Sequence, residues 1–173
     1  MCIEKYEEKL KFVNDQSAAI EVELEAYADE FLQEHYNRTL DIPIKLNGRL
    51  TRSLGRFVSN TLGESLRIEI SKDLCTDALL TEDNSRLYGV IKHECIHYAL
   101  FEQGLPSNDD DIEFINSCYK AGAPLTGIID IKQREHHYMC AAGHEHFRTR
   151  RVNLERQSCG CGEELEYLGR IIR

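Results

Sequence analysis

Two histidines lie four residues apart in the stretch "VIKHECIHYAL", residues 90–100, and a glutamate directly follows the first. Positions i and i+4 of a helix share one face, so His93 and His97 can direct both imidazoles at one ion. Zn²⁺ accepts such nitrogen ligands and is readily four-coordinate. Glu94 lies beside the ion without needing to bind it, where it can take a proton from water and pass it to a leaving amine. The spacing therefore predicts a zinc site suited to hydrolysis.

The alternative interpretation is an exposed helix face with solvated histidines. The neighbours of the motif argue against it, because Val90, Ile91, Ile96 and Leu100 are apolar and indicate a buried helix. Two histidines and a glutamate in the middle of such a helix are costly without a partner.

A third protein ligand must come from elsewhere, and no histidine lies between His97 and His136. The acidic stretch "NDDDIEF" supplies candidates, because a carboxylate is an acceptable zinc ligand. Asp109 and Asp110 are both placed to reach back from the start of the next helix. The alternative role for these aspartates is capping and compensation of the helix dipole.

Apolar periodicity and punctuating glycines predict the helices that position the motif. A first helix is predicted over 4–36, with a break near Asn14–Asp15 and with Asp15 or Ser17 capping its second part. A strong helix runs from Asn84 or Ser85 to Gln103, and the stretch "SKDLCTDALL" before it reads as a loop or a short helix. Another helix follows the aspartates and stops at Gly122.

Residues between the first helix and the motif alternate in polarity and are broken by Pro43 and several glycines. This pattern predicts three short strands, roughly 44–50, 54–58 and 66–70, as an antiparallel meander. Helices and a small sheet together indicate the α+β class.

The composition fits a globular protein of one ordinary domain with a small appendage: 173 residues, 42% hydrophobic and 29% charged. There is no apolar run of membrane-spanning length and no secretory signal at the start, so we expect a cytoplasmic protein without a membrane partner. Seven cysteines in a reducing compartment favour metal ligands or core residues over disulfides.

The charge is distributed unevenly along the chain. Residues 132–173 carry eight basic and six acidic side chains, a net of +2, so the remainder of the total charge of −9 leaves −11 on residues 1–131. This asymmetry, with a change of composition towards Cys, His, Arg and Gly, predicts two domains, 1–132 and 133–173.

The second domain offers a second set of metal ligands. Cys140, His144, Cys159 and Cys161 supply three thiolates and one imidazole from two short turns, which is the closed pattern of a structural zinc. A module of about 40 residues with few large apolar side chains depends on metal for much of its stability. His137 and His146 are alternatives to His144, and free cysteines in a flexible tail are the alternative to a site.

A basic stretch, "FRTRRVNLER", lies between these two turns. Its arginines, Arg148, Arg150, Arg151 and Arg156, can contact phosphates, and Phe147 can stack on a base. The alternative is a solvated strand of a small ribbon, and the acidic charge of the rest of the chain weighs against tight binding of nucleic acid.

Several stretches in order resemble the SprT-like family, whose eukaryotic relatives include Spartan, a protease of DNA–protein crosslinks. The similar stretches cover about residues 40–168 and are "RLTRSLGRF" with "LRIEISKDL", "GVIKHECIHYAL", "DDDIEFINSCYKAGAP", and "YMCAAGHEHFRTRRVNLERQSCGCGEEL". The resemblance implies a zincin-like core domain followed by a C-terminal zinc ribbon.

Two departures from the family pattern stand out. The family's third histidine is replaced by Asp109 in an ungapped match to bacterial members, or by Asp110 when counted back from Phe114. The two CxxC turns of the usual ribbon are here "CAAGH" and "CGC".

The resemblance implies a zinc metallopeptidase with a gluzincin-like mechanism and Glu94 as the catalytic base. It also implies polypeptide substrates on DNA, either associated or crosslinked, and single-stranded or crosslinked DNA as a partner through the ribbon. A non-catalytic zinc-binding adaptor with a degenerate site is the alternative, and a hydrolase of another bond class is a third.

Overall fold

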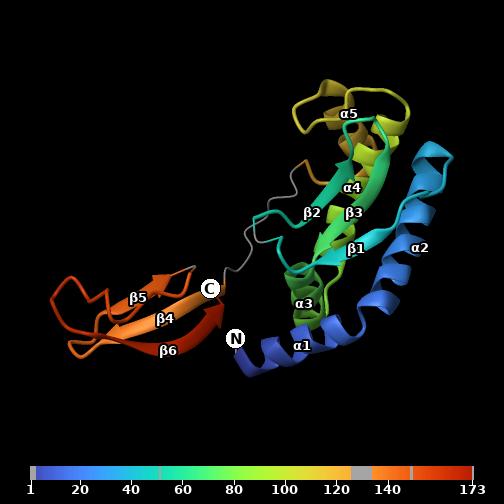
Figure 1. Ribbon diagram of the computed structural model, residues 1–173. Helices are drawn as coiled ribbons and strands as arrows, with labels where there is room; N and C mark the ends of the chain where they lie inside the picture. Colours follow the sequence, from blue (N-terminus) through green and yellow to red (C-terminus); the bar gives the residue numbers. More distant parts are fainter. Residues whose placement is uncertain (1–2, 51, 126–133, 149, 173) are drawn as a thin grey trace. The chain divides into compact units, whose positions relative to one another are not determined.

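The computed structural model of the protein describes residues 3–50, 52–125, 134–148 and 150–172 (Figure 1). The chain divides into two compact units, residues 8–129 and residues 130–173 together with 1–7. The predicted domain boundary at residue 132 lies within residues 126–133, which are outside the described residues. Within the described residues, five helices and two three-stranded sheets confirm the α+β class.

The five helices follow the predicted apolar periodicity. In chain order they are α1 (Ile3–Asp15), α2 (Ser17–Tyr36), α3 (Lys72–Thr81), α4 (Ser85–Glu102) and α5 (Ile112–Ala121). The stretch that could be a loop or a short helix is α3. Gly122 ends α5 with a φ of +62°, a left-handed conformation that glycine adopts without steric cost. No described helix combines the length and the apolar character that a membrane-spanning segment needs.

The predicted break between α1 and α2 is confirmed, but the predicted cap is wrong. The N-cap of α2 is Gln16, and no side-chain hydrogen bond caps it. Ser17 instead donates its hydroxyl to the carbonyl of Val13 at 2.8 Å. The chain stays nearly helical across the junction, where the amides of Gln16 and Ile20 already pair with carbonyls four residues back. A side-chain acceptor is therefore not needed there.

The sheet of the larger unit contains the three predicted strands in an unpredicted order. They are β1 (Ile44–Asn47), β2 (Gly55–Ser59) and β3 (Ser65–Ser71), arranged β1-β3-β2. β2 and β3 form an antiparallel hairpin, whereas β1 runs parallel to β3 with Ile44 opposite Ile68. The expected antiparallel meander is thus corrected to a mixed sheet. β3 takes the centre because its second half, including Ile68 and Ile70, is buried.

The outer edge of β1 is closed by carboxylates from α2, which lies alongside it (Figure 1). Glu25 accepts the amide of Ile44 at 2.9 Å, and Glu21 accepts the amide of Leu46 at 2.9 Å. These glutamates are four residues apart and so lie on one helix face, matching alternate amides of the strand. The opposite edge of the sheet is formed by β2, which lies beside α4.

A buried carboxylate ties the three strands together on the polar side of the sheet. Glu69 of β3 is 5% exposed and accepts hydrogen bonds from Asn47 at 2.9 Å, Arg56 at 2.6 Å and Arg67 at 2.7 Å. Burial raises the pKa of this carboxyl, but the three donors outweigh burial and lower the pKa to about 2.

The smaller unit has its own antiparallel sheet, as expected for a ribbon. Its strands are β4 (Arg134–Cys140), β5 (Glu145–Arg148) and β6 (Leu165–Ile172), in the order β5-β4-β6. Tyr138 in the central strand is fully buried, and its hydroxyl accepts the amide of Val152 at 2.9 Å. This contact holds the long connection between β5 and β6 on the sheet.

Candidate metal centres

His93 and His97 lie one turn apart on α4, which is packed in the core through residues such as Val90, Ile91 and Ile96. The Nδ1 atom of His93 is 2.9 Å from the carbonyl oxygen of Pro124, and that of His97 is 2.5 Å from the carbonyl oxygen of Ser107. A carbonyl only accepts, so each Nδ1 carries a proton, and in the neutral form of each ring Nε2 presents a lone pair.

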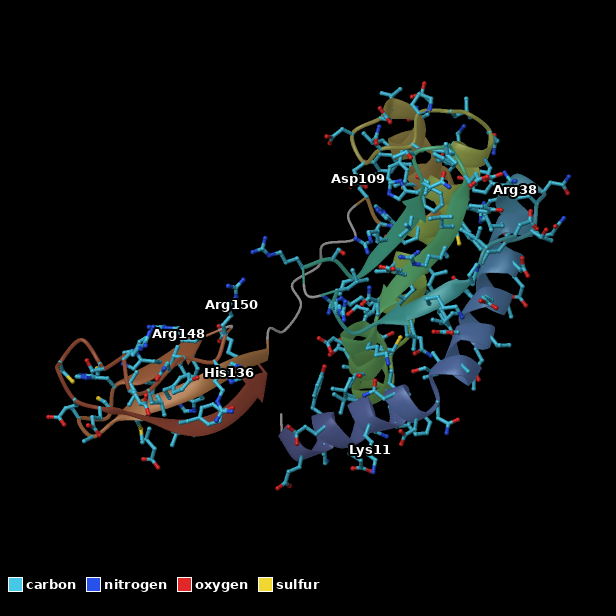
Figure 2. The ribbon with its side chains drawn as sticks, in the orientation of Figure 1. Lys11, Arg38, Asp109, His136, Arg148 and Arg150 are labelled. Atoms are coloured by element: carbon cyan, nitrogen blue, oxygen red, sulfur yellow. The ribbon has the colours of Figure 1, made fainter. Side chains whose placement is uncertain are left out.

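Asp109 completes a compact triangle with these two nitrogens. The two Nε2 atoms lie 3.1 Å apart, and Oδ1 of Asp109 lies 3.2 Å from each of them. Asp109 lies on the loop before α5 (Figure 2). Asp110, the other predicted candidate, is exposed and does not belong to this group. We call the group of His93, His97 and Asp109 the helix site.

The aspartate loop is fixed by the remaining member of the acidic stretch. Asp111 is the N-cap of α5, and its Oδ2 accepts hydrogen bonds from the backbone and side-chain nitrogens of Asn108 at 2.7 and 2.9 Å. The three consecutive aspartates therefore have three different environments. The loop brings Asp109 to the histidines because Asp111 ties the loop to the start of the helix.

The helix site fits a divalent cation. Three electron-rich atoms face one another at about van der Waals distance, and Oδ1 carries negative charge, so a positive ion at the centre removes their repulsion. Two ligands of a tetrahedral zinc ion at about 2.0–2.1 Å are separated by about 3.3 Å, close to the observed 3.1–3.2 Å. Burial lowers the pKa of His97, which favours the neutral imidazole that a metal requires.

Glu94 lies next to these ligands but points to the sheet edge. It is 4% exposed, and its Oε2 accepts the amide of Phe57 on β2 at 2.7 Å. Burial raises its pKa to about 8, against the hydrogen bond from Phe57 and with the help of the negative charge of Asp109. A group with this pKa can exchange protons near neutral pH.

Gly55 makes room for that carboxylate. A Cβ atom at this position would lie 2.7 Å from Oε1 of Glu94 and 2.6 Å from a methyl group of Val90. Any side chain here would displace the buried glutamate or the helix below it. A glycine in a strand is a signal of close backbone approach, but it does not identify the partner that the backbone approaches.

Phe114 packs against both histidine rings of the helix site, a role that its residue type alone does not indicate. Its fully buried ring stacks on His97 with centroids 4.0 Å apart and meets His93 edge-on at 5.0 Å. These contacts fix both ring planes. The carbonyls of Ser107 and Pro124 were also missed, because a backbone acceptor leaves no residue-type signal in a sequence.

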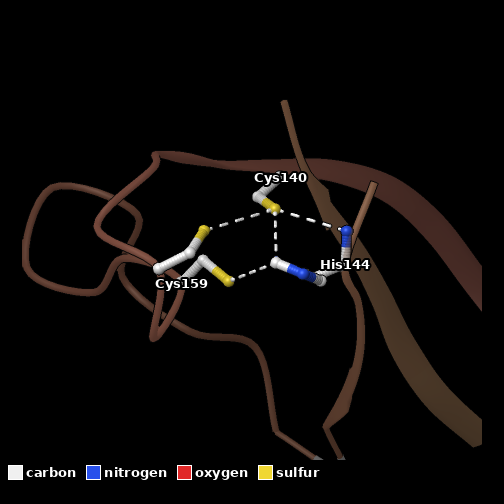
Figure 3. A group of neighbouring side chains, drawn as sticks. Cys140, His144 and Cys159 are labelled. Carbon is white, nitrogen blue, oxygen red and sulfur yellow. Dashed lines mark hydrogen bonds between the residues drawn. The ribbon is translucent and has the colours of Figure 1, made fainter. Parts of the chain in front are cut away.

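The second predicted ligand set is also brought together (Figure 3). Nδ1 of His144 lies 3.5 Å from the sulfurs of both Cys140 and Cys159, and the sulfur of Cys161 lies 3.8 Å from that of Cys140. A tetrahedral zinc ion with Zn–S of about 2.3 Å separates two sulfurs by about 3.8 Å, whereas a disulfide holds them at about 2.0 Å. We call these four residues the ribbon site.

Two equivalent backbone turns present these ligands. In the first, Cys140 and His144 are joined by the hydrogen bond from the amide of Cys140 to the carbonyl of His144. In the second, the amide of Cys159 donates to the carbonyl of Glu163 in the same register. The first turn thus uses its first and fifth residues as ligands, and the second uses its first and third.

The predicted substitutes for His144 are not in the ribbon site. His146 lies just outside, with Nε2 3.2 Å from the sulfur of Cys159. His137 stacks on Phe147 with centroids 4.7 Å apart.

Burial raises the pKa of the Cys140 thiol, but the backbone amide of His144 and the neighbouring thiols outweigh burial and lower the pKa to about 7.

The remaining described cysteines are core residues, as expected. Cys75, Cys95 and Cys118 are buried, and none belongs to either ligand group. Burial raises the pKa of the Cys75 thiol to about 12 and that of Cys118 to about 11, so these thiols are unreactive at neutral pH.

Comparison with known proteins finds a family profile and several relatives that match this sequence. The profile of the SprT-like family matches residues 22–133. A Bacillus velezensis protein named "Protein SprT-like" is 34% identical over 119 residues, which cover 66% of this chain and 74% of the relative. The protein of that name from Oceanobacillus iheyensis is 27% identical over 144 residues, 81% of this chain and 91% of the relative.

A third relative of the same name, from Streptococcus agalactiae, is 30% identical over 117 residues, 66% of this chain and 77% of its own. No solved structure is significantly similar to the chain. The family profile spans α4 and the aspartate loop, and so includes all of the helix site. On this evidence, the chain belongs to the SprT-like family.

Proposed function

We propose that the protein is a zinc-dependent metallopeptidase with the helix site as its active centre. The observation that supports this is the convergence of His93, His97 and Asp109 to 3.1–3.2 Å beside the buried Glu94. Among the described residues no fourth His, Cys, Asp or Glu joins the group. Three protein ligands with an open position are typical of catalytic zinc sites, and four are typical of structural ones.

Each residue has a defined task in this mechanism. His93, His97 and Asp109 would hold the ion, which when bound would supply Lewis acidity towards the scissile carbonyl and water. Glu94 takes a proton from the attacking water and delivers it to the leaving amine. The amide of Phe57 binds Oε2 of Glu94, so Oε1 is the oxygen proposed to take the proton.

The edge of β2 is the proposed binding surface for an extended polypeptide substrate. β2 is an edge strand, and Gly55 and Phe57 lie directly beside Glu94. A substrate that adds as a further strand would have its backbone aligned next to the base. The opposite edge, at β1, is already occupied by Glu21 and Glu25 of α2.

DNA is the proposed partner of the ribbon, and DNA-associated or DNA-crosslinked proteins are the proposed substrates. Supporting this, Arg148, Arg150, Arg151 and Arg156 are exposed, and Figure 2 shows Arg148 and Arg150 on the ribbon. Arg148 and Arg150 are free of acidic partners within the described residues, so they can neutralise phosphates. Changing Arg148 and Arg150 together to Glu should weaken binding of a labelled single strand in fluorescence anisotropy, whereas Arg86→Glu should not.

The decisive test of peptidase activity is Glu94→Gln. This variant should keep its zinc, because Glu94 is not a ligand, and should cleave a DNA-bound protein substrate about 10²- to 10⁴-fold more slowly. Metal analysis and a cleavage assay on gels check both expectations. Asp110→Asn is the matched control, since it removes a nearby exposed carboxylate outside the helix site.

The second candidate function is a non-catalytic adaptor, which the high exposure of Asp109 favours. Its side chain is 67% exposed, so the third ligand is held less firmly than the two histidines. Two zinc ions per chain without cleavage by the unaltered protein would support the adaptor and contradict the peptidase. Cleavage that survives Glu94→Gln would contradict the proposed mechanism.

A further inference from the structure

The donor set of the helix site differs in chemical hardness from a set of three histidines. Two imidazoles and one carboxylate come together here, and among the described residues no fourth His, Cys, Asp or Glu joins them. Carboxylate oxygen is a harder donor than imidazole nitrogen and suits Mn²⁺ as well as Zn²⁺. Two histidines and one carboxylate with open positions are also the facial donor set of six-coordinate iron(II).

The distances fit a six-coordinate ion as well as a tetrahedral one. For ligands at right angles, separations of 3.1–3.2 Å correspond to a metal–ligand distance of about 2.2 Å, which suits the larger divalent ions. For tetrahedral ligands, the same separations correspond to about 1.9 Å, slightly shorter than zinc prefers. The triangle is therefore not built for zinc alone.

Asp109 can also supply a second ligand atom. Its contacts with the described residues run through Oδ1, to His93 and His97, and its side chain is 67% exposed. The exposed side chain leaves Oδ2 accessible, so the carboxylate can bind through both oxygens, which a single imidazole nitrogen cannot do. Solvent can fill the remaining positions of a six-coordinate ion at this open side.

We propose that the helix site accepts six-coordinate divalent ions, with Mn²⁺ as the test case, in addition to Zn²⁺, and that Asp109 sets this broad selectivity. The inference deepens the proposed function and rests on its assignment of the metal ligands. Zinc still binds more tightly in absolute terms, because the order of stability of divalent ions places Mn²⁺ lowest. The informative quantity is therefore the ratio of the dissociation constants for Mn²⁺ and Zn²⁺.

The test uses the full chain and three variants. Titration with Mn²⁺, followed by the electron paramagnetic resonance signal of the free ion, gives one dissociation constant, and competition with a zinc indicator gives the other. Asp109→His should raise the Mn²⁺-to-Zn²⁺ ratio about tenfold or more, since it replaces the hard oxygen by nitrogen. Asp110→Asn, the matched control, should change the ratio less than about twofold.

His93→Ala identifies which bound ion belongs to the helix site, because acidic surface groups also attract Mn²⁺. One Mn²⁺ per chain should be lost in this variant, and the ribbon thiolates are too soft to hold the ion. An unchanged ratio in Asp109→His, or Mn²⁺ binding that is indifferent to His93→Ala, overturns the proposal. Circular dichroism confirms folding, and Asp109→Asn is a second variant of unchanged size, which should weaken Mn²⁺ more than Zn²⁺.

These outcomes are independent of peptidase activity. If no metal form cleaves a protein substrate but the ratio responds to Asp109→His, the selectivity holds and the proposed peptidase function fails. If cleavage occurs with zinc but the ratio does not respond, the peptidase stands and the role of Asp109 in selectivity is contradicted.

Discussion

The helix site and the ribbon site differ in the number of ligands, their softness and their supports. The helix site has three ligands, and two of them are oriented by backbone carbonyls of Ser107 and Pro124. The ribbon site has four ligands, three of them thiolates, on two turns that pair their own backbones. An open, harder site suits chemistry on a bound substrate, whereas a closed, soft site suits permanent retention of zinc.

The two sites also differ in how much buried core surrounds them. The helix site lies on a packed core, with Phe114 fully buried beneath its rings. The ribbon site joins loops of a three-stranded sheet, where Tyr138 is the main fully buried side chain among the described residues. Loss of a bound ion should therefore cost the proposed peptidase activity at the first site and folding at the second.

The largest effect is expected from Cys159→Ser. Structural zinc contributes on the order of 10 kcal/mol to the folding of small modules, so the ribbon should unfold while residues 8–129 keep their structure and their own ion. Amide exchange measured by NMR or mass spectrometry, with metal analysis, checks this. Ser158→Ala is the neighbouring control, and equal loss of protection in both units would break the contrast between them.

Gly55→Ala should affect the helix site alone. The added methyl group meets Glu94 and Val90 at 2.6–2.8 Å, so the base is displaced and cleavage falls about 10–100-fold with zinc retained. Gly48→Ala is matched to it, because a Cβ atom there lies 3.7 Å from the nearest atom, in Lys72. Equal cleavage rates for the two variants would contradict the positioning role of Gly55.

The stability of the larger unit should depend on pH through Glu69. The folded pKa of about 2 lies below the ordinary value of 4.5, so this carboxylate stabilises the fold fully above pH 5 and progressively less as pH falls towards 2. Glu69→Gln should cost about 2 kcal/mol at pH 7 and little near pH 2–3. Urea unfolding at the two pH values measures this, with the exposed Glu64→Gln as control.

The ribbon should respond to acid for a different reason, since its thiolates must be protonated before zinc leaves. Release of the ribbon ion at a higher pH than the titration of Glu69 would show that the two units respond to acid through different groups. A Glu69→Gln penalty that is the same at pH 7 and pH 3 would show that the pKa of this carboxyl is not lowered.

The smallest effect is expected from His146→Ala. Nε2 of His146 lies 3.2 Å from the sulfur of Cys159 and can donate to the thiolate without binding the ion. Its removal should speed zinc release to a chelator about tenfold. His137→Ala, in which the lost ring stacks on Phe147 outside the ribbon site, should leave the rate unchanged. Similar rates in both variants would assign His146 no part in holding the metal.

The parts of the molecule that follow from the sequence are those in which local periodicity determines the structure. The helical spacing of His93 and His97 and the two cysteine turns are short-range patterns, and the structure brings these residues together. The parallel pairing of β1 with β3 was not predicted, because strand order depends on contacts between distant residues. The choice between Asp109 and Asp110 likewise needed the loop geometry that Asp111 fixes.

The carboxylates of Glu21 and Glu25 on α2 have a consequence for self-association. Exposed strand edges let copies of a protein stack into endless fibres, because each added copy offers a fresh edge. Here the amides of Ile44 and Leu46 on the outer edge of β1 are already satisfied inside the molecule, so copies that pair through β2 cannot extend the same sheet through β1. This sheet can therefore keep its β2 edge available without supporting open-ended strand addition through β1.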